Sequence, residues 1–199
     1  MTTFNPKSEY VLEDERVLLR PLRLDDWKNL LPFSLNEPDT WTYSSVTGAG
    51  EENMKALIRQ ALDWRQEGHH YPFIVFDKNA KAYAGITRFY DIQPANQMLQ
   101  LGYTWYGKDF RGMGLNKHCK YLLLQFAFEQ LGMERVEFRA DARNNRSIAA
   151  MKSIGCKAEG IIRSHAPLRE GGRRDSVILS VLKPEWDAEV KARLKSKLS

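Results

Sequence analysis

A glycine-containing segment between an alternating stretch and a long apolar stretch constrains the fold of this chain most. Residues 97–106 alternate between apolar and polar types, which predicts a strand. Gly112 and Gly114 follow, and residues 115–131 then carry an apolar stripe at helical spacing. The first N–H groups of such a helix lack partners and lie at the positive end of its dipole. The segment therefore predicts a strand–loop–helix unit that binds a phosphate group.

Two other phosphate-binding patterns fail in this sequence context. Residues 102–109 have the spacing of a P-loop, but they end in Asp109 where a magnesium-binding hydroxyl is needed, and their interior is aromatic. The Gly112-x-Gly114-x-x-Lys117 pattern lacks the third glycine of a dinucleotide fingerprint. It also follows a meander instead of opening a βαβ unit, so neither a P-loop nor a dinucleotide site is expected.

The remaining periodicities predict one domain of mixed α/β type over residues 1–199, with a core from about residue 17 to residue 182. Strands are expected at 17–20, 71–76, 83–90, 97–106, 135–140, 157–165 and 174–182, and helices at 25–34, 52–66, 115–131, 144–154 and, amphipathic and C-terminal, 184–198. Within the fourth strand, alternation places four apolar side chains on one face, namely Leu99, Leu101, Tyr103 and Trp105.

Composition narrows the classes of ligand. The net charge of +5 suits a phosphorylated ligand, nucleic acid or anionic lipid, but no aromatic stacking signature accompanies the basic residues, so nucleic acid is not expected. No apolar stretch is long enough to span a bilayer and no targeting signal is evident, which predicts a cytoplasmic protein without a membrane partner. Cys119, Cys156 and His118 belong to no convergent ligand set, so no metal is expected.

Several motifs in order resemble those of a known family. Arg111-x-x-Gly114-x-Asn116 resembles the acetyl-CoA pyrophosphate loop of the GCN5-related N-acetyltransferases (GNAT), with Asn116 where the family has a small residue. Further matches resemble the RimJ/RimL branch of that family, with Cys156 in place of an aromatic residue. They are Asn36-Glu37-Pro38, Asn144-x-x-Ser147, Ile154-Gly155-Cys156, Glu159-Gly160 and Arg174-Asp175. The resemblance covers roughly residues 17–182, most of the chain.

The resemblance implies a GNAT fold, in which a mixed, mostly antiparallel central sheet is flanked by helices. The family's fourth and fifth strands, here 97–106 and 135–140, splay apart and form the acetyl-CoA cleft. Carried over position by position, the implied cofactor-binding residues are Tyr103, Thr104, Trp105, Tyr106, Arg111, Gly112, Met113, Gly114, Leu115, Asn116, Asn144 and Ser147. Core packing is the alternative role for the side chains of Tyr103 and Trp105.

The implied reaction is direct attack of a neutral amine on the thioester in a ternary complex, with a backbone N–H stabilising the oxyanion. Many relatives supply a tyrosine as the acid where this chain has Met151, so Ser147 is the candidate proton donor; a helix N-cap is its alternative role. No carboxylate follows Glu159-Gly160, so His165 is the candidate base, with a plain hydrogen-bonded histidine as the alternative.

The acceptor is expected to be an α-amine, of a small molecule or a protein N-terminus. An α-amine has a pKa of about 7.7–8.0 and is partly neutral near pH 7, whereas a lysine near ~10.4 needs a stronger base. The helix 25–34, residues 41–43 and the turn 169–173 are expected to line its pocket, with Phe33 and Trp41 facing substrate or covering the core. The sequence leaves the oligomeric state open, with a homodimer as one candidate because relatives often pair. A non-catalytic acyl-CoA-binding module and a basic RNA- or ribosome-associated protein are the alternative functions.

Overall fold

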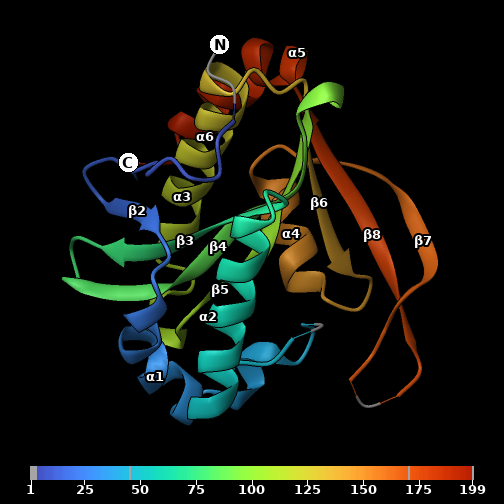
Figure 1. Ribbon diagram of the computed structural model, residues 1–199. Helices are drawn as coiled ribbons and strands as arrows, with labels where there is room; N and C mark the ends of the chain where they lie inside the picture. Colours follow the sequence, from blue (N-terminus) through green and yellow to red (C-terminus); the bar gives the residue numbers. More distant parts are fainter. Residues whose placement is uncertain (1–3, 45, 170, 199) are drawn as a thin grey trace.

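One sheet organises the chain in the computed structural model, which describes every residue except 1–3, 45, 170 and 199. Within that part, eight strands follow the order β1-β2-β3-β4-β5-β6-β8-β7 (Figure 1). Their bounds are Leu12–Glu13 (β1), Val17–Pro21 (β2), His70–Asp77 (β3), Ala82–Gln93 (β4), Met98–Tyr106 (β5), Arg135–Asp141 (β6), Lys157–Pro167 (β7) and Arg173–Leu182 (β8). The predicted strands are confirmed, with β4 extending three residues further than expected.

Helices cover both faces of this sheet. On one face, α1 (Trp27–Asn36) and α2 (Glu51–Gln66) pack with a short 3-10 turn (Pro38–Trp41) around a cluster that contains Leu30, Trp41 and Ile58. On the other face lie α3 (Leu115–Gln125, continued by a π turn), α4 (Asn145–Ser153) and the C-terminal helices α5 (Lys183–Glu185) and α6 (Lys191–Lys195). None of the described helices combines the length and the apolar character that a bilayer crossing requires.

The pairing of β5 with β6 is parallel and short, whereas every other pairing in the described sheet is antiparallel. It joins Met98 to Arg135, Leu99 to Val136 and Gln100 to Glu137, and no pair follows. Beyond that point β5 stays bonded to β4 and β6 stays bonded to β8. The predicted mixed, mostly antiparallel sheet with two splayed strands is confirmed.

A β-bulge at Tyr103 corrects the predicted arrangement of side chains along β5. Ile86 pairs with Trp105, but Arg88 pairs with Gly102, so two residues of β5 oppose one residue of β4. Tyr103 takes a φ of 50°, in the left-handed region. As a result Leu99 and Leu101 pack in the α3-side core, while Trp105 packs in the α2-side cluster. The expectation that Leu99, Leu101, Tyr103 and Trp105 share one face is therefore wrong, because alternation does not survive an inserted residue.

We predict that Gly85→Ala destabilises the sheet beside this bulge. A Cβ at Gly85 would lie 2.0 Å from the backbone oxygen of Trp105, so β4 and β5 would have to separate. The expected loss of unfolding free energy is about 3 kcal/mol or more, measured as a lower urea midpoint. Gly160→Ala in β7 is the matched control, because its Cβ meets nothing within 4 Å. Equal midpoints for the two variants would contradict this account.

Candidate active site

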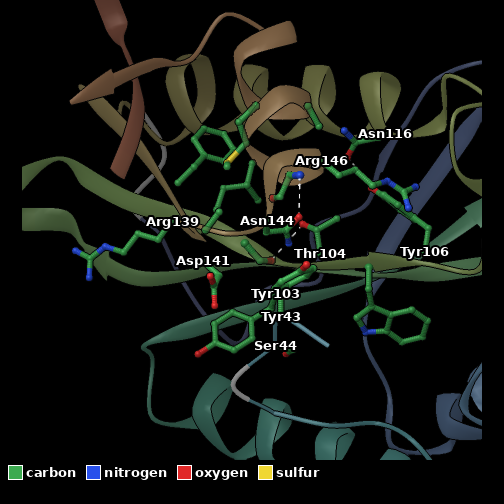
Figure 2. A pocket seen from close by; sticks show the side chains of 18 of the residues that line it. Tyr43, Ser44, Tyr103, Thr104, Tyr106, Asn116, Arg139, Asp141, Asn144 and Arg146 are labelled. Atoms are coloured by element: carbon green, nitrogen blue, oxygen red, sulfur yellow. Dashed lines mark hydrogen bonds between the residues drawn. The ribbon is translucent and has the colours of Figure 1, made fainter. Parts of the chain in front are cut away.

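A cavity of about 810 Å³ opens where β5 and β6 separate, and it is lined from both faces of the sheet. At one end lie Asn116 and Arg146, and at the other lie Tyr43 and Ser44 of the loop after the 3-10 turn (Figure 2). Thr104 of β5 stands between the two ends. We call the end around Tyr43 and Ser44 the far chamber. A ligand in this cavity could thus contact the glycine loop and the far chamber at the same time.

The glycine loop presents an open, cationic end. Gly112 and Gly114 have φ values of 78° and 82°, and a Cβ at either would meet nothing within 4 Å. Glycine is therefore needed for backbone conformation, and the space beside the loop is free for a ligand. Gly114 is the N-cap of α3, whose first N–H groups have no helical acceptor. Arg146 and Lys117 line the same end, which suits a pyrophosphate.

The side chain of Arg111 holds this loop in place. Its Nε donates to the carbonyl oxygen of Tyr106 at 2.7 Å and its Nη2 donates to Thr40 Oγ1 at 2.7 Å. Burial and the nearby Arg146 lower the Arg111 pKa. Two neighbouring loop residues do not line the cavity: Met113 is 64% exposed, and Leu115 is fully buried in the core.

The unpaired half of β5 lines the middle of the cavity. Tyr103, Thr104, Trp105 and Tyr106, for which the resemblance implies cofactor binding, all line it. The hydroxyl of Tyr106 donates to Asn116 Oδ1 at 3.3 Å, which turns the Asn116 side chain toward the strand. The Thr104 hydroxyl contacts Thr87 Oγ1 at 2.7 Å.

The two residues predicted to face substrate have different places. Trp41 lines the cavity, although it is only 1% exposed and packs against Trp105 with ring centroids 5.4 Å apart. Phe33 does not line the cavity: it packs edge-on against Trp105 and Phe110 in the α2-side core. The substrate role for Phe33 is therefore replaced by its alternative, core packing.

The start of α4 settles which residue caps that helix. Asn144 is the N-cap, since its Oδ1 accepts a hydrogen bond from the backbone N–H of Ser147 at 3.0 Å. The alternative role given to Ser147, capping this helix itself, therefore belongs to Asn144. The hydroxyl of Ser147 makes no hydrogen bond to another residue in the described part of the chain, and Ser147 lines the cavity beside Met151.

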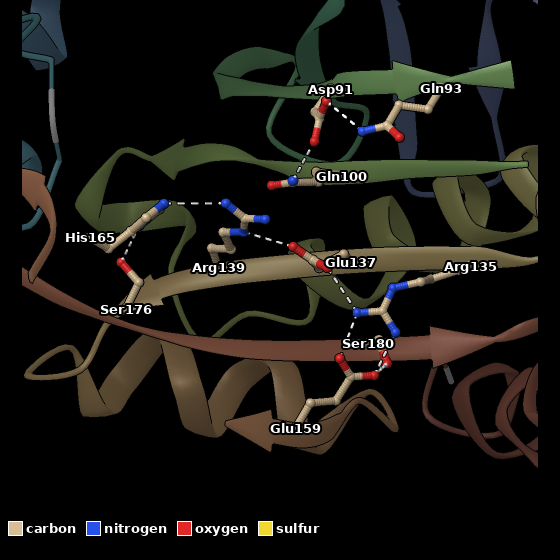
Figure 3. Close-up of polar contacts among 10 residues, drawn as sticks. All are labelled: Asp91, Gln93, Gln100, Arg135, Glu137, Arg139, Glu159, His165, Ser176 and Ser180. Carbon is tan, nitrogen blue, oxygen red and sulfur yellow. Dashed lines mark hydrogen bonds and ion pairs between the residues drawn. The ribbon is translucent and has the colours of Figure 1, made fainter. Parts of the chain in front are cut away.

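His165 also lines the cavity, but both of its ring nitrogens have partners (Figure 3). Nη1 of Arg139 lies 3.3 Å from Nε2, and Ser176 Oγ lies 2.9 Å from Nδ1. A guanidinium can only donate, so Nε2 accepts and the ring is neutral with its proton on Nδ1. Burial, then Arg139 and Arg174, lower the His165 pKa. These contacts make His165 a weak base.

Sequence reasoning missed two buried cations that line the cavity. Lys120 of α3 is 5% exposed and donates from Nζ to Thr104 Oγ1 at 3.0 Å; burial lowers its pKa to about 8. Arg88 of β4 is 2% exposed, and burial lowers its pKa to about 10. No local pattern marks either residue, because the cavity that makes them accessible is built from distant elements.

The hairpin of β7 and β8 closes the far chamber. Arg174 Nη1 donates to the carbonyl oxygen of Tyr43 at 3.3 Å, and Arg169 Nη2 donates to that of Trp41 at 3.0 Å. This brings the predicted acceptor-pocket segments 41–43 and 169–173 together, apart from residue 170, which lies outside the described residues.

One group of potential metal ligands lies away from the cavity lining. Ligand atoms of Asp14, Glu15 and His118 come within 4.8 Å of one another, a proximity that sequence spacing could not reveal. Asp14 Oδ2 contacts His118 Nδ1 at 2.7 Å, and Asp14 Oδ1 accepts from the N–H groups of Arg16 and Val17. The group thus ties the N-terminal segment to α3, and we assign it this structural role.

Comparisons with known proteins agree with this geometry. Residues 16–157 match the family described as "Acetyltransferase (GNAT) domain". The chain is 25% identical over 176 residues to p20 of Bacillus licheniformis, called an uncharacterized N-acetyltransferase, covering 88% of this chain and 97% of that protein. A provisionally assigned acetyltransferase from T. thermophilus shares 34% identity at a TM-score of 0.87, with all of both chains covered. RimL, a ribosomal L7/L12 alpha-N-protein acetyltransferase solved in complex with coenzyme A, shares the fold at a TM-score of 0.75 and 17% identity, covering 88% of this chain and 99% of its own.

The chain therefore belongs to the GNAT acetyltransferase family and is an enzyme of the N-acetyltransferase type. The strand–loop–helix unit that the sequence predicted, formed by β5, the loop with Gly112 and Gly114, and α3, lies within the matched residues.

We predict that Lys120→Met stabilises the protein at pH 7. The pKa of Lys120 drops from 10.5 to about 8 on folding. Below pH 8 the amine is charged in both states and the full cost of burying it is present; the cost fades between pH 8 and about 10.5, where only the unfolded chain still binds the proton. At about 1.4 kcal/mol per pKa unit, the gain at pH 7 is up to about 3 kcal/mol, less the lost bond to Thr104.

Urea unfolding at pH 7 and pH 10 measures this difference. The gap between Lys120→Met and wild type should narrow at pH 10. Lys152→Met on the exposed side of α4 is the control and should change stability by no more than about 0.5 kcal/mol at either pH. A variant less stable than wild type at pH 7 would contradict the prediction.

Proposed function

We propose that the protein transfers the acetyl group of acetyl-CoA to a primary α-amine, by direct attack in a ternary complex. The observation that carries this proposal is the continuity of the cavity, which runs from a pyrophosphate-type anion end, past the open edge of β5, to the end near Tyr43 and Ser44. The coenzyme A bound to RimL, which has the same fold, supports the choice of carrier.

The residues of the cavity fit acetyl-CoA. Backbone N–H groups of residues 112–116 would hold the pyrophosphate, with Arg146 and Lys117 balancing its charge. Residues 103–106 of β5 have no β6 partner, so their backbone is free to pair with the amides of the pantetheine arm. The side-chain NH₂ of Asn144 has no hydrogen-bond partner among the described residues, since capping uses only its Oδ1.

The proposed chemistry needs one nucleophile and one leaving group. The nitrogen lone pair attacks the thioester carbonyl carbon, a C–N bond forms, and the C–S bond breaks with its electron pair leaving on sulfur. The amine loses one proton and the thiolate can take one up. Ser147 is the proposed hydrogen-bond donor to that sulfur, and Lys120, with its pKa near 8, is the second donor that the cavity offers.

The far chamber, in which the acceptor would bind, favours an α-amine over lysine. Arg88, Arg139 and Arg174 line it, and cations disfavour a charged ammonium beside them. Of the described carboxylates that line the cavity, Asp141 pairs with Arg143, and Asp39 is exposed to water, which screens its charge. An amine of low intrinsic pKa would lose its proton here without a strong base, which matches the weak basicity of His165.

The loop assignment predicts that Arg146→Glu weakens acetyl-CoA binding. Reversing one charge at this partly exposed end should raise Kd about 10-fold at low salt, less at high salt. Titration of acetyl-CoA, followed by thermal stabilisation, measures it. Arg163→Glu makes the same charge change at an exposed site of β7 outside the cavity, and its Kd should stay near wild type. Equal Kd values for the two variants would contradict the assignment of this loop to the acetyl-CoA site.

The catalytic assignment predicts that Ser147→Ala lowers kcat about 10- to 100-fold without changing acetyl-CoA affinity. Because Asn144 and not Ser147 caps α4, the substitution leaves the helix intact. Asn144→Ala is the contrasting variant and should cost about 1 kcal/mol of stability. Thiol release against an α-amine library supplies kcat. If Lys120→Met lowers kcat and Ser147→Ala does not, Lys120 is the proton donor instead of Ser147. If the protein binds acetyl-CoA but turns over no amine, the alternative of a non-catalytic acyl-CoA-binding module is favoured.

A further inference from the structure

Arg88 is a buried cation whose N–H groups find no acceptor in the part of the chain that the structure describes. Its Nε and Nη1 atoms are buried without a hydrogen-bond partner, and no described residue accepts from Nη2 either. The side chain is 2% exposed, yet it lines the cavity. The cavity is therefore the place from which a partner could reach it.

Two aromatic rings contact the guanidinium of Arg88 without accepting hydrogen bonds from its N–H groups. Its carbon lies 4.2 Å from the ring centroid of Tyr103 and 5.9 Å from that of Trp64. Such contacts attract the charge through the flat face of the group. The five N–H donors lie in the plane of the guanidinium, so ring contacts leave them without acceptors.

Two carboxylates on strands of the same sheet are already engaged by other residues, as Figure 3 shows. Asp91, also on β4, accepts from Gln93 and from Gln100 at 2.9 and 2.7 Å. Glu137 of β6 accepts from Arg135 and Arg139 at 2.8 and 2.7 Å. Leaving a buried charge unpaired is costly, which points to an anion that arrives with a ligand.

We propose that Arg88 binds a carboxylate carried by the acceptor itself, so that the enzyme acetylates amines that bear a carboxylate in the same molecule. This inference rests on the proposed function and names its substrate class. Arg88 lies opposite Gly102, next to the Tyr103 bulge and the open edge of β5, so its ligand would share the chamber with the reacting amine. A planar carboxylate matches the planar guanidinium through paired hydrogen bonds. The same chemistry is present in a free amino acid and in a peptide that begins with Asp or Glu.

Matched acceptors test the inference on the full-length chain. Each amino acid is compared with its primary amide, and dipeptide amides that begin with Asp or Glu are compared with those that begin with Asn or Gln. The readout is thiol release from acetyl-CoA. We expect kcat/KM for the carboxylate member of at least one matched set to exceed that of its amide roughly 10- to 100-fold, mainly through KM. The set that shows the preference identifies the source of the carboxylate.

Variants at Arg88 separate binding from fold. Arg88→Met should abolish the preference for the carboxylate member, and Arg88→Lys should keep part of it, since an ammonium retains the charge but not the paired geometry. Comparing each variant with wild type on the same two substrates cancels the difference in their amine basicity. Arg59→Met, at an exposed position of α2, is the matched control and should leave the preference unchanged. Stabilisation by acetyl-CoA shows that each variant is folded.

The outcomes are distinct. Equal kcat/KM for carboxylates and amides, turnover of amides alone, turnover of aminoethyl phosphate in place of carboxylates, or a preference that survives Arg88→Met would each overturn the inference and leave the proposed function standing. Failure of acetyl-CoA to stabilise the wild-type chain, with no turnover of any amine, would overturn the proposed function and this inference with it.

Discussion

The early end of the β5–β6 pairing is the constraint on which the rest of the site depends. After three residue pairs, the facing edges of these two strands carry backbone N–H and C=O groups that no neighbouring strand satisfies. Such groups are costly to bury without partners. The gap is stable because it is a cavity that water or a ligand with amide groups can fill. The bulge at Tyr103 adds local twist at the same place and directs neighbouring side chains to opposite faces.

The general fold could be predicted from sequence because it rests on local periodicity. The apolar stripe of α3, the aromatic and β-branched residues of β3, the alternation in β6, and the glycines at 112 and 114 each act over a few residues, and each is found where expected. The bulge at Tyr103 could not be predicted, since an inserted residue leaves composition and alternation unchanged until two strands are paired. The cap of α4 was ambiguous for a related reason: Asn144 and Ser147 are both capping types, and only the hydrogen bond decides between them.

The two buried cations of the cavity were the hardest residues to find from sequence. Arg88 lies in a strand and Lys120 in an apolar helix. In the sequence each resembles an ordinary charged residue, and only the structure shows that it is buried and lines the cavity. They approach β5 from opposite faces of the sheet: Lys120 contacts Thr104, and Arg88 contacts Tyr103. Two buried cations without an acidic partner lower the stability of the empty protein. Such a cost is understandable where binding an anionic carrier or acceptor offsets it.

The cationic chamber also explains how the reaction could proceed without a strong base. Arg139 occupies the lone pair of His165 Nε2, so this histidine is poorly placed to take a proton. A carboxylate next to an amine normally stabilises the ammonium form and raises the amine pKa. Once the carboxylate pairs with Arg88, that stabilisation is largely cancelled, while Arg139 and Arg174 continue to disfavour the charged amine. Arg88 would thus bind the acceptor and also favour the neutral, nucleophilic form of its amine. The same ion pair would contribute to both recognition and activation.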